Sequence, residues 1–494
     1  MHQIPTEQVL LRIGDENIWW QKPHAIPKIY DDLRHRAYFN LLYPLVTQLD
    51  VNRAILLMGP RRVGKTVLLH HVVKRLIEDL VDPRRICYLS VDHPIYNNCS
   101  LHDLLRHYQD ASGTTINGGQ TFVIFDEIQY VRDWEVQLKT LVDSYPGVRF
   151  VASGSAAAAL KLKSNESGAG RFTDFLLPPL TFHEYLDLLN KMDLIGPPVS
   201  DERFRFRSSP DITALNAAFV HYLNFGGYPE VIFSPTIQAD PTRFIKSDII
   251  DKVLLRDLPS LYGITDIREL NYLFTSLAFN TANEVSSEQL SQKANVAGIT
   301  IRKYIDYLEA AFLIKIVHRI DRSAKRFRRE SAFKVYLTNP SIRSALFAPM
   351  SDGDEGMGHL VETGIFSQWF HSPTVGRLHY ARWKNGEVDV VALNEELKPI
   401  WVLEVKWSDR YVDNHGDLKS LMAFCKVNDV SLVAVTSKSR FGTKNIGGID
   451  VMFIPASLYC FTIGFNIVSS REMITKIETA KPPAEASELR GATN

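Results

Sequence analysis

The chain contains little cysteine, and the few cysteines that occur are scattered. Cys87, Cys99, Cys425 and Cys460 are distributed over 494 residues, and none has a partner at zinc-binding spacing. The sequence therefore indicates neither a disulfide-stabilised fold nor a structural zinc site. We expect a reduced, cytoplasmic protein.

The chain also lacks an excess of either charge. Lys and Arg together number 56, and Asp and Glu together also number 56. A strongly basic chain favours non-specific binding to nucleic acid, and this balance does not. Any contact with DNA has to come from a local patch of basic residues.

Long apolar runs are missing. No run approaches about 18 residues, the length that a membrane-spanning helix needs. Residues 1–16 mix acids with apolar residues and lack the pattern of a signal peptide, so we expect no membrane segment. The hydrophobic share of 45% is ordinary for a globular protein, and this length predicts about three domains.

The most informative stretch that is present reads ILLMGPRRVGKTVLLH, residues 55–70. A short apolar strand, a glycine-containing loop and a helical apolar pattern follow one another, with the spacing G-x-x-x-x-G-K-T. The glycines allow backbone N–H groups to surround a phosphate, and the helix N-terminus points at the same anion. Lys65 is expected to reach the β- and γ-phosphates of ATP, and Thr66 to ligate Mg²⁺. The expected nucleotide-binding residues of this loop are Gly59, Pro60, Arg61, Arg62, Val63, Gly64, Lys65, Thr66 and Val67.

A second motif, which is acidic, supports this interpretation. Residues 122–125 form an apolar strand that ends in Asp126-Glu127. An acid at the tip of a buried strand can hold Mg²⁺ through water, and the next one can polarise the attacking water. The alternative is a solvated strand end. Strands and helices alternate from residue 51 to 155, which predicts a parallel sheet with helices on both faces and catalytic groups at the carboxyl ends of its strands. Ser153 or Ser155, after the last of these strands, is expected beside Asp126 or as a plain helix cap.

Two further stretches are candidates for nucleotide contacts. Arg171 follows a glycine-rich turn and is expected to touch the γ-phosphate, in its own subunit or in a neighbour's, or else to form a surface salt bridge. Residues 224–229, NFGGYP, allow a close backbone approach to a flat group such as adenine, or form a simple turn between helices.

Residues 265–320 have the order helix, tight turn, helix, strand, which is the layout of a winged helix. Arg302 and Lys303 on its second helix are expected to contact DNA phosphates, unless the winged helix serves only for packing. Seven of the sixteen residues in 319–334 are Lys or Arg. This basic patch is the best expected nucleic-acid contact, or otherwise a solvated loop.

A further α/β pattern covers residues 355–475. Asp389 lies inside an apolar strand, and Glu404 and Lys406 alternate on another, so they are expected on one face. Burying such an acid is costly unless it binds something. Asp389, Glu404 and Lys406 are therefore predicted to hold Mg²⁺ or Mn²⁺ and activate water for phosphodiester cleavage; the alternative is ordinary charges at strand ends.

Taken together, GPRRVGKT, FVIFDEIQ, FVASGS, AGRF, PLTFHEYL and GGYPEV resemble the prokaryotic AAA+-type ATPases that carry a C-terminal restriction-endonuclease-like domain, relatives of the signal-transducing (STAND) ATPases. The resemblance covers about residues 30–470. It implies phosphate and Mg²⁺ binding at Lys65 and Thr66, a metal-holding Asp126, a catalytic base at Glu127, a γ-phosphate-sensing arginine at Arg171 and Pro229 at the adenine. The set of Glu362, Asp389, Glu404 and Lys406 is similar to the PD-(D/E)xK nuclease pattern, with Glu362, Asp389 and Glu404 as metal ligands. In one departure from this family, Thr338-Asn339-Pro340-Ser341 replaces the usual Asp-x-Gly-Leu turn.

The expected fold class is α/β, with a P-loop NTPase core of AAA+ type built on a parallel sheet. The expected segments are an ATPase core with an irregular N-terminal lead-in at 1–185, a helical lid at 186–260, a winged helix at 261–340, a restriction-endonuclease-like domain at 341–475 and a disordered tail at 476–494. The leading functional hypothesis is an ATP- and Mg²⁺-dependent enzyme that acts on DNA through an ATP-gated nuclease. The alternative is a nucleotide-controlled switch, such as an oligomerising scaffold, whose C-terminal domain is a non-catalytic binding module.

Overall fold

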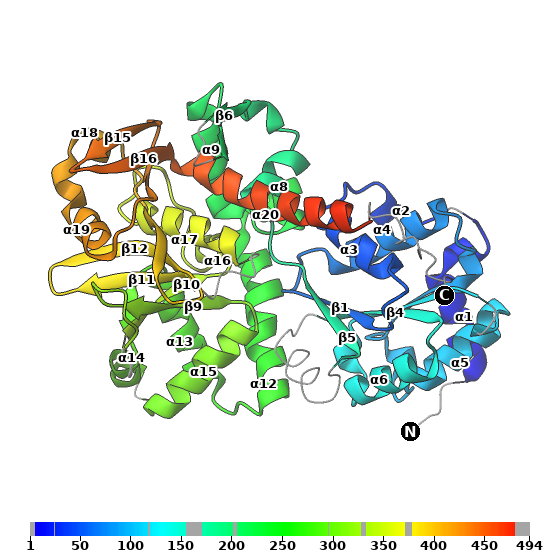
Figure 1. Ribbon diagram of the computed structural model, residues 1–494. Coiled ribbons are helices and arrows are strands. Elements are labelled where there is room, and N and C mark those ends of the chain that lie inside the picture. Colours follow the sequence, from blue (N-terminus) through cyan, green and yellow to red (C-terminus); the bar gives the residue numbers. More distant parts are fainter. Residues whose placement is uncertain are drawn as a thin grey trace, which may run out of the picture.

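The computed structural model describes residues 5–23, 25–116, 119–154, 170–200, 205–294, 296–327, 332–370 and 378–479. Figure 1 shows two lobes, one formed by the N-terminal part of the chain and the other by its middle and C-terminal parts. Helix α20 (Ala456–Thr479) runs from the second lobe back toward the first.

The N-terminal lobe is built on a parallel five-stranded sheet with the order β2-β3-β4-β1-β5. Its strands are β1 (Ala54–Met58), β2 (Ile86–Ser90), β3 (Thr121–Asp126), β4 (Val148–Gly154) and β5 (Phe172–Leu176). Its helices are α1 (Thr6–Glu16), α2 (Lys28–Asp31), α3 (Phe39–Thr47), α4 (Lys65–Glu78), α5 (Leu101–Ser112) and α6 (Trp134–Ser144), with 3₁₀ turns η1 (Ile18–Trp20), η2 (Pro83–Arg85), η3 (Pro94–Tyr96) and η5 (Ile128–Tyr130).

The apolar strands of this sheet are buried on both faces. On β1, Ile55 and Leu57 face one core while Leu56 and Met58 face the other, as the two-residue period of a strand requires. Because the sheet is parallel and buried on both faces, the carboxyl ends of β3, β4 and β1 lie along the same edge, with β4 in the middle. The loop after β1 and the acid at the end of β3 therefore meet at one edge.

The expectation of an irregular lead-in at the N-terminus is wrong, because residues 6–16 form helix α1. Its buried side chains are Val9 and Ile13, too few to give a clear helical signal. The following Asn17 is fully buried and pairs with the edge of β2: its Nδ2 donates to the Tyr88 carbonyl at 2.9 Å, and its Oδ1 accepts from the Tyr88 N–H at 2.7 Å. The N-terminal segment is thus packed along the edge of the sheet.

The segment from 182 to 262 is mainly helical, as expected, with one short hairpin. It contains α8 (Phe182–Leu188), η6 (Met192–Leu194), β6 (Pro198–Ser200), β7 (Arg205–Arg207), α9 (Ile212–Phe225), α10 (Pro229–Phe233), α11 (Pro235–Ala239), the π-helical stretches η7 (Thr242–Asp251) and η8 (Val253–Asp257), and α12 (Leu258–Tyr262).

The second lobe contains a nine-stranded mixed sheet with the order β15-β16-β14-β13-β12-β11-β9-β10-β8. Its first part comprises α13 (Ile267–Phe279), β8 (Glu284–Ser286), α14 (Ser287–Ala294), α15 (Gly298–Ala310), β9 (Ile314–Ile320) and β10 (Ala332–Leu337). Its second part comprises α16 (Ser341–Leu346), α17 (Met357–Trp369), β11 (Leu378–Trp383), β12 (Gly386–Leu393), β13 (Pro399–Glu404), α18 (Arg410–Asp413), η10 (His415–Leu418), α19 (Lys419–Asn428), β14 (Val433–Ser437), β15 (Gly442–Ile446), β16 (Ile449–Pro455) and α20.

The sheet crosses the boundary that we expected at residue 340. Strand β9 pairs antiparallel with β10 on one side and parallel with β11 on the other, with His318 opposite His379. The middle and C-terminal segments therefore share one sheet instead of forming separate bodies.

Helix α20 continues to Thr479, past the point where we expected a tail to begin, and residues 480–494 lie outside the described residues. It packs on α8 and α3 of the N-terminal side and on α17 of the second lobe. Among the described residues, no helix is both long and apolar enough to cross a membrane.

Candidate nucleotide and carboxylate sites

The phosphate loop connects β1 to α4 and takes the shape that its glycines permit. Gly64 is left-handed, with φ 93°, and directly precedes α4, so the first N–H groups of the helix face the loop. A Cβ on Gly59 would lie 2.1 Å from the Leu177 carbonyl oxygen. This close passage of the backbone explains why only glycine fits at Gly59.

Lys65 is buried and folds over its own loop. Its Nζ donates to the carbonyl oxygens of Gly59 at 3.0 Å and Pro60 at 2.8 Å. Burial lowers the pKa of Lys65, while the nearby carboxylates of Glu127 and Asp126 oppose that shift. The ammonium group is thus held where a phosphate can replace the carbonyl oxygens as its partner.

Asp126 is the point where the polar groups of the sheet edge converge. Its carboxylate accepts hydrogen bonds from the hydroxyls of Thr66 at 2.7 Å and Tyr88 at 2.6 Å, and also from Ser153. Ser153 in turn accepts the N–H of Glu127 at 3.1 Å. The structure therefore places Ser153 beside Asp126; Ser155 lies outside the described residues.

Glu127 follows Asp126 in the left-handed conformation, with φ 57° and ψ 45°, and its carboxylate accepts from Gln129. A non-glycine residue in this region is uncommon and stores local strain. The turn directs the chain away from the sheet at the point where an attacking water is expected.

Two loop arginines pair with carboxylates of the helical segment. Arg61 holds Asp257 through two hydrogen bonds of 2.8 and 2.9 Å. Arg62 contacts Glu230 at 2.7 Å and Asp248 at 3.0 Å. The loop that we expected to bind phosphate is therefore tied to α10, η7 and η8, a connection without any signal in the sequence.

Arg36 is a residue that sequence reasoning missed. It is buried and pairs with Glu184 through bonds of 2.9 and 2.7 Å, while its Nη1 donates to the carbonyl oxygens of Val63 and Pro178 at 3.0 and 2.8 Å. One side chain thus fastens the phosphate loop to α8. Because its partners are 27 or more residues away in sequence, no local pattern could reveal it.

Arg171 lies at the amino-terminal end of β5, next to Ala54, whereas the phosphate loop follows the opposite end of β1. It is partly exposed and pairs with Asp143 at 2.9 Å. The expected contact with the γ-phosphate of its own subunit does not fit this position, since the length of a strand separates the two. A contact with a neighbouring subunit stays a prediction.

Pro229 does lie at the loop: a Cβ on Gly64 would be 3.9 Å from its ring. The adjoining cavity, lined by residues including Arg62, Tyr228 and Phe244, measures about 20 Å³. That space suits one water molecule, so binding of an adenine base there requires the helices around it to move.

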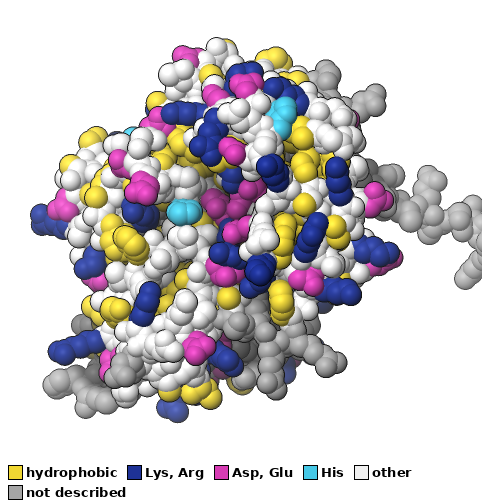
Figure 2. Space-filling view, turned by 90° about the vertical axis from the view of Figure 1, so that its left-hand side faces the viewer, with side chains coloured by type: hydrophobic (Ala, Val, Ile, Leu, Met, Phe, Trp, Pro, Cys, Tyr) yellow, Lys and Arg dark blue, Asp and Glu magenta, His cyan; other side chains and the backbone are white. Residues whose placement is uncertain are grey.

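A second polar site lies in the other lobe, where a pocket of about 720 Å³ opens among β10, α17, β12 and β13. Figure 2 shows acidic side chains gathered in a hollow of this face, with Lys and Arg around it. The predicted residues Glu362, Asp389, Glu404 and Lys406 all line this pocket. Glu362, Asp389 and Glu404 come from α17, β12 and β13, and Lys406 follows two residues after the end of β13, on the same side as Glu404.

Asp389 is the centre of the part formed by β12 and β13. It accepts the Val405 N–H at 2.9 Å and lies 3.4 Å from Lys406, whose Nζ is 2.8 Å from Glu404. Burial and the neighbouring Asp389 raise the pKa of Glu404 to about 7. Burial works in the same direction on Asp389, but Lys406 and Lys334 outweigh it and lower its pKa to about 2.

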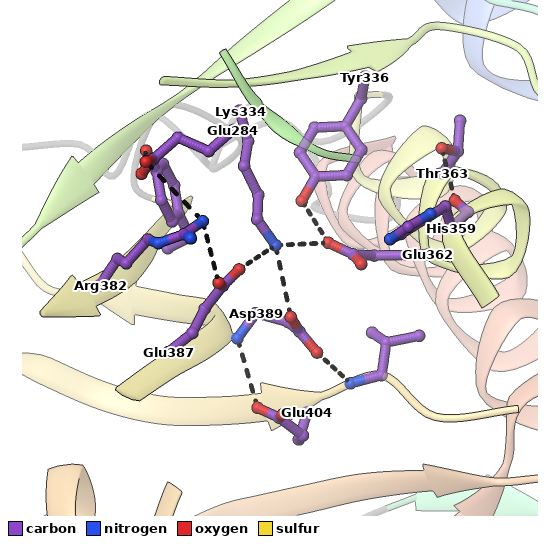
Figure 3. Close-up of polar contacts among 12 residues, drawn as sticks. Glu284, Lys334, Tyr336, His359, Glu362, Thr363, Arg382, Glu387, Asp389 and Glu404 are labelled. Atoms are coloured by element: carbon purple, nitrogen blue, oxygen red, sulfur yellow. Dashed lines mark hydrogen bonds and ion pairs between the residues drawn. The ribbon is translucent and has the colours of Figure 1, made fainter. Parts of the chain in front are cut away.

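The other part of the pocket, shown in Figure 3, contains residues that we had not predicted as members of this site. Lys334 of β10 points into the cluster, with its Nζ 3.0 Å from Glu362, 2.7 Å from Glu387 and 3.4 Å from Asp389. Lys334 had been counted in the basic DNA-binding patch; its side chain is 3% exposed, so that assignment is wrong.

The carboxylates fit a divalent cation by type but not by placement. Oxygen ligands are what Mg²⁺ and Mn²⁺ prefer, yet the Lys334 ammonium lies among the oxygens that would bind the ion. Among the described residues, no group of three or more His, Cys, Asp or Glu side chains is arranged to hold a metal. The predicted ligand set of Glu362, Asp389 and Glu404 is therefore not assembled in this conformation.

The other predicted DNA contacts are at the surface. Arg302 and Lys303 are exposed on α15. Of the 319–334 patch, Arg319 donates to the Arg382 carbonyl at 3.1 and 2.9 Å and lies over Phe327, while Arg322, Lys325 and Arg326 are exposed. Residues 328–331 lie outside the described residues.

Comparison with known proteins supports an assignment for the N-terminal lobe. A protein-family profile described as an AAA domain matches residues 51–186, and one described as a domain of unknown function matches residues 216–352. The first match coincides with the parallel sheet and the phosphate loop, so this lobe has an AAA-type P-loop ATPase core.

Two similar proteins are described as uncharacterized. An uncharacterized protein of Methanocaldococcus jannaschii is 26% identical over 313 residues, covering 61% of this chain and 64% of that protein. Another, of Haemophilus influenzae, is 25% identical over 426 residues, covering 84% of this chain and 96% of its own length. The chain thus spans slightly less than two thirds of the archaeal relative.

Two solved structures resemble the fold only weakly. Caenorhabditis elegans PCH-2 shares 16% identity over 43% of this chain and 60% of that chain, with a TM-score of 0.25. The Saccharomyces cerevisiae Hsp104–ADP complex shares 13% identity over 56% and 39%, with a TM-score of 0.30. Scores this low support no inference about function.

Proposed function

We propose that the protein binds ATP with Mg²⁺ at the phosphate loop and hydrolyses it. The single observation that carries this proposal is the hydrogen bond of 2.7 Å between Thr66 and Asp126. It brings a hydroxyl at the start of α4 and a carboxylate at the tip of β3 together beside the loop's N–H groups, as a magnesium-nucleotide site requires.

Each residue then has a defined role. The loop amides and Lys65 bind the phosphates, and Lys65 exchanges the carbonyl oxygens of its loop for phosphate oxygens. Thr66 and Asp126 would hold Mg²⁺, which would supply positive charge next to the phosphates. Glu127 orients and deprotonates the attacking water. Ser153 and Tyr88 keep the Asp126 carboxylate oriented.

The test separates binding from hydrolysis. Lys65→Ala is expected to weaken ATP binding by at least about tenfold, or about 1.4 kcal/mol, as measured by titration with a fluorescent ATP analogue. Glu127→Gln is expected to keep ATP binding and to reduce turnover by about 10²-fold or more. Full ATP affinity and turnover in Lys65→Ala would refute the proposal.

A second candidate function is action on DNA by the other lobe, and the pocket that brings Asp389, Glu404 and Lys406 together supports it. In this proposal, the winged helix expected at residues 261–340 contacts DNA through Arg302, Lys303 and the exposed part of the 319–334 patch. Asp389 and Glu404 would hold a metal, and Lys406 would face the phosphate.

The alternative is a nucleotide-controlled switch with a non-catalytic pocket, and the position of Lys334 favours it. Plasmid cleavage with ATP and Mg²⁺ or Mn²⁺ distinguishes the two. A nuclease requires cleavage that Asp389→Ala abolishes and metal dependence that Glu404→Ala changes. Intact DNA together with nucleotide-dependent oligomerisation would favour the switch, in which Arg171 of one subunit would contact the nucleotide of another.

A further inference from the structure

Lys334 lies at the centre of the carboxylate pocket, but it comes from a different part of the chain. It belongs to β10, which lies between β9 and β8 and pairs with both. Its carboxylate partners follow 28 to 55 residues later in sequence, on α17 and β12. The pocket is thus shared between the predicted winged helix and the predicted nuclease-like domain.

The ammonium group of Lys334 is fully engaged by acids. Its Nζ is 3.4 Å or less from oxygens of Glu362, Glu387 and Asp389, and it also lies 5.6 Å from the centre of the Tyr380 ring. With its side chain 3% exposed, solvent contributes little to its solvation. A buried ammonium of this kind is stable only while such partners surround it.

Strand β10 is held in this position by several contacts. Tyr336, two residues on and on the same face, donates to Glu362 at 2.6 Å, and its ring stacks on Phe366. The Leu337 N–H donates to Thr281 at 3.1 Å, and the Thr281 and Thr363 hydroxyls are hydrogen-bonded at 2.8 Å. These contacts fix the backbone of β10 against α17, so that Lys334 is held next to the carboxylates.

Two lysines divide the carboxylates between them. Lys406 contacts Asp389 and Glu404, and Lys334 contacts Asp389, Glu362 and Glu387. A divalent cation bound by Asp389 and Glu362 would lie next to the Lys334 ammonium. Like charges at that separation repel each other strongly where water is largely excluded.

We propose that Lys334 is the resident cation of this pocket and competes with a divalent metal ion for the carboxylates of Glu362 and Asp389. The inference rests on the second candidate function for the identity of the competing ion. In the conformation described, the Lys334 ammonium occupies the carboxylate oxygens that a divalent ion needs, and the ion binds when this ammonium is displaced.

The experiment is a titration with Mn²⁺ of full-length, nucleotide-free protein, followed by the electron paramagnetic resonance signal of free Mn²⁺. Lys334→Met is expected to bind Mn²⁺ at least about tenfold more tightly than the wild type. Adding Asp389→Asn to Lys334→Met should abolish that binding. Lys384→Met removes the same charge from an exposed position between β11 and β12 and should leave Mn²⁺ affinity at the wild-type value.

A second measurement covers the case in which Lys334→Met unfolds because buried carboxylates lose their partner. Lys334→Gln keeps a donor for Glu362, and Mn²⁺ should raise its melting temperature more than that of the wild type, because a ligand stabilises the state that binds it. Equal increases in the two proteins would count against competition.

The outcomes separate this inference from the function on which it rests. Equal Mn²⁺ affinity in wild type and Lys334→Met, lost in both with Asp389→Asn, would overturn the competition by Lys334 and leave the metal site intact. No Mn²⁺ binding in any of these proteins would overturn both the competition and the metal-dependent nuclease. Neither result affects the proposed ATPase.

Discussion

Arg36 shows how much a single residue contributes to the phosphate loop. Its guanidinium joins Glu184 of α8 to the carbonyl oxygens of Val63 and Pro178, and both charged side chains are buried, at 6% and 1% exposed. The pair also satisfies the capping box of α8, because Glu184 accepts the Thr181 N–H. Loss of one partner leaves the other as an uncompensated buried charge.

We therefore expect Arg36→Met to lower the free energy of unfolding by about 3–5 kcal/mol. Urea denaturation measures this change. The double variant Arg36→Met/Glu184→Met should be more stable than the single variant, since it removes both charges. If both variants lost the same stability, the buried pair would not be the cause.

His71 on α4 makes a pH-dependent contribution to the free energy of unfolding. Its Nε2 is hydrogen-bonded to the Tyr30 carbonyl at 3.1 Å, and among the described residues Nδ1 has no partner. Burial, assisted by the neighbouring His35, lowers the pKa of His71 to about 4. The folded protein therefore keeps this imidazole neutral at pH values where an unfolded histidine is protonated.

Because the pKa is lower in the folded state, the stabilising contribution is complete above about pH 6.5 and is lost as pH falls toward 4. We expect His71→Gln to flatten this part of the stability profile, by up to about 1.4 kcal/mol for each unit of pKa difference. Urea unfolding at several pH values measures it. Identical slopes in wild type and variant would contradict the assignment.

At the scale of elements, the arginines of the phosphate loop couple nucleotide binding to the helical segment. Asp257 is mostly buried and accepts hydrogen bonds from both Nε and Nη2 of Arg61, whereas Glu230 on Arg62 is exposed. A bound triphosphate would compete with these carboxylates for the same guanidinium groups. The strength of the competition should follow burial, because buried pairs are screened less by solvent.

Asp257→Asn is accordingly expected to strengthen ATP binding by about three- to tenfold, or about 0.7–1.4 kcal/mol. Glu230→Gln, the exposed counterpart, should have a smaller effect that disappears in high salt. Titrations at low and high ionic strength compare the two. A weaker affinity in Asp257→Asn would show that the ion pair supports the loop instead of competing with phosphate.

Most elements could be predicted because their signals are local. The alternation of β1, α4 and β3 is encoded in short apolar runs separated by turn residues, and the phosphate loop is a contiguous motif whose chemistry depends on spacing. Helix α1 was missed because only Val9 and Ile13 of it are buried. The sheet that joins β9 to β11 was missed because strand pairing across 60 or so residues leaves no local pattern.

The carboxylate pocket likewise could be predicted only where the sequence pattern is local. Asp389, Glu404 and Lys406 were predicted since acids inside apolar strands are conspicuous. Lys334 was assigned to the basic patch because it ends a stretch rich in Lys and Arg, although strand β10 places its side chain inside the protein. Identifying it required knowledge of which strand lies beside α17, and that is a property of the fold.

For the whole molecule, α20 is one of the elements that contact both lobes. Gly464 allows it to lie close to α8 and α17: a Cβ there would be 2.9 Å from the Thr181 Cβ and 3.0 Å from the Gln368 side-chain oxygen. Gln368 also accepts the Phe182 N–H at 3.0 Å. A larger side chain at Gly464 would push the helix off this junction.

We expect Gly464→Leu to destabilise the protein by about 1–3 kcal/mol through overpacking and to lower the melting temperature in a thermal scan. Asn466→Leu, which places the same side chain at an exposed position of α20, is the matched control and should leave the melting temperature nearly unchanged. Equal behaviour of the two variants would mean that α20 does not fit tightly at Gly464.

The return of α20 also has a consequence for biosynthesis. The surface of α3 and α8 that this helix covers is translated long before residues 456–479 are made. During synthesis, that apolar surface stays uncovered until the ribosome has also delivered residues 456–479. A stalled nascent chain would therefore expose it to chaperones and proteases, and an abundant N-terminal fragment should be short-lived in the cell.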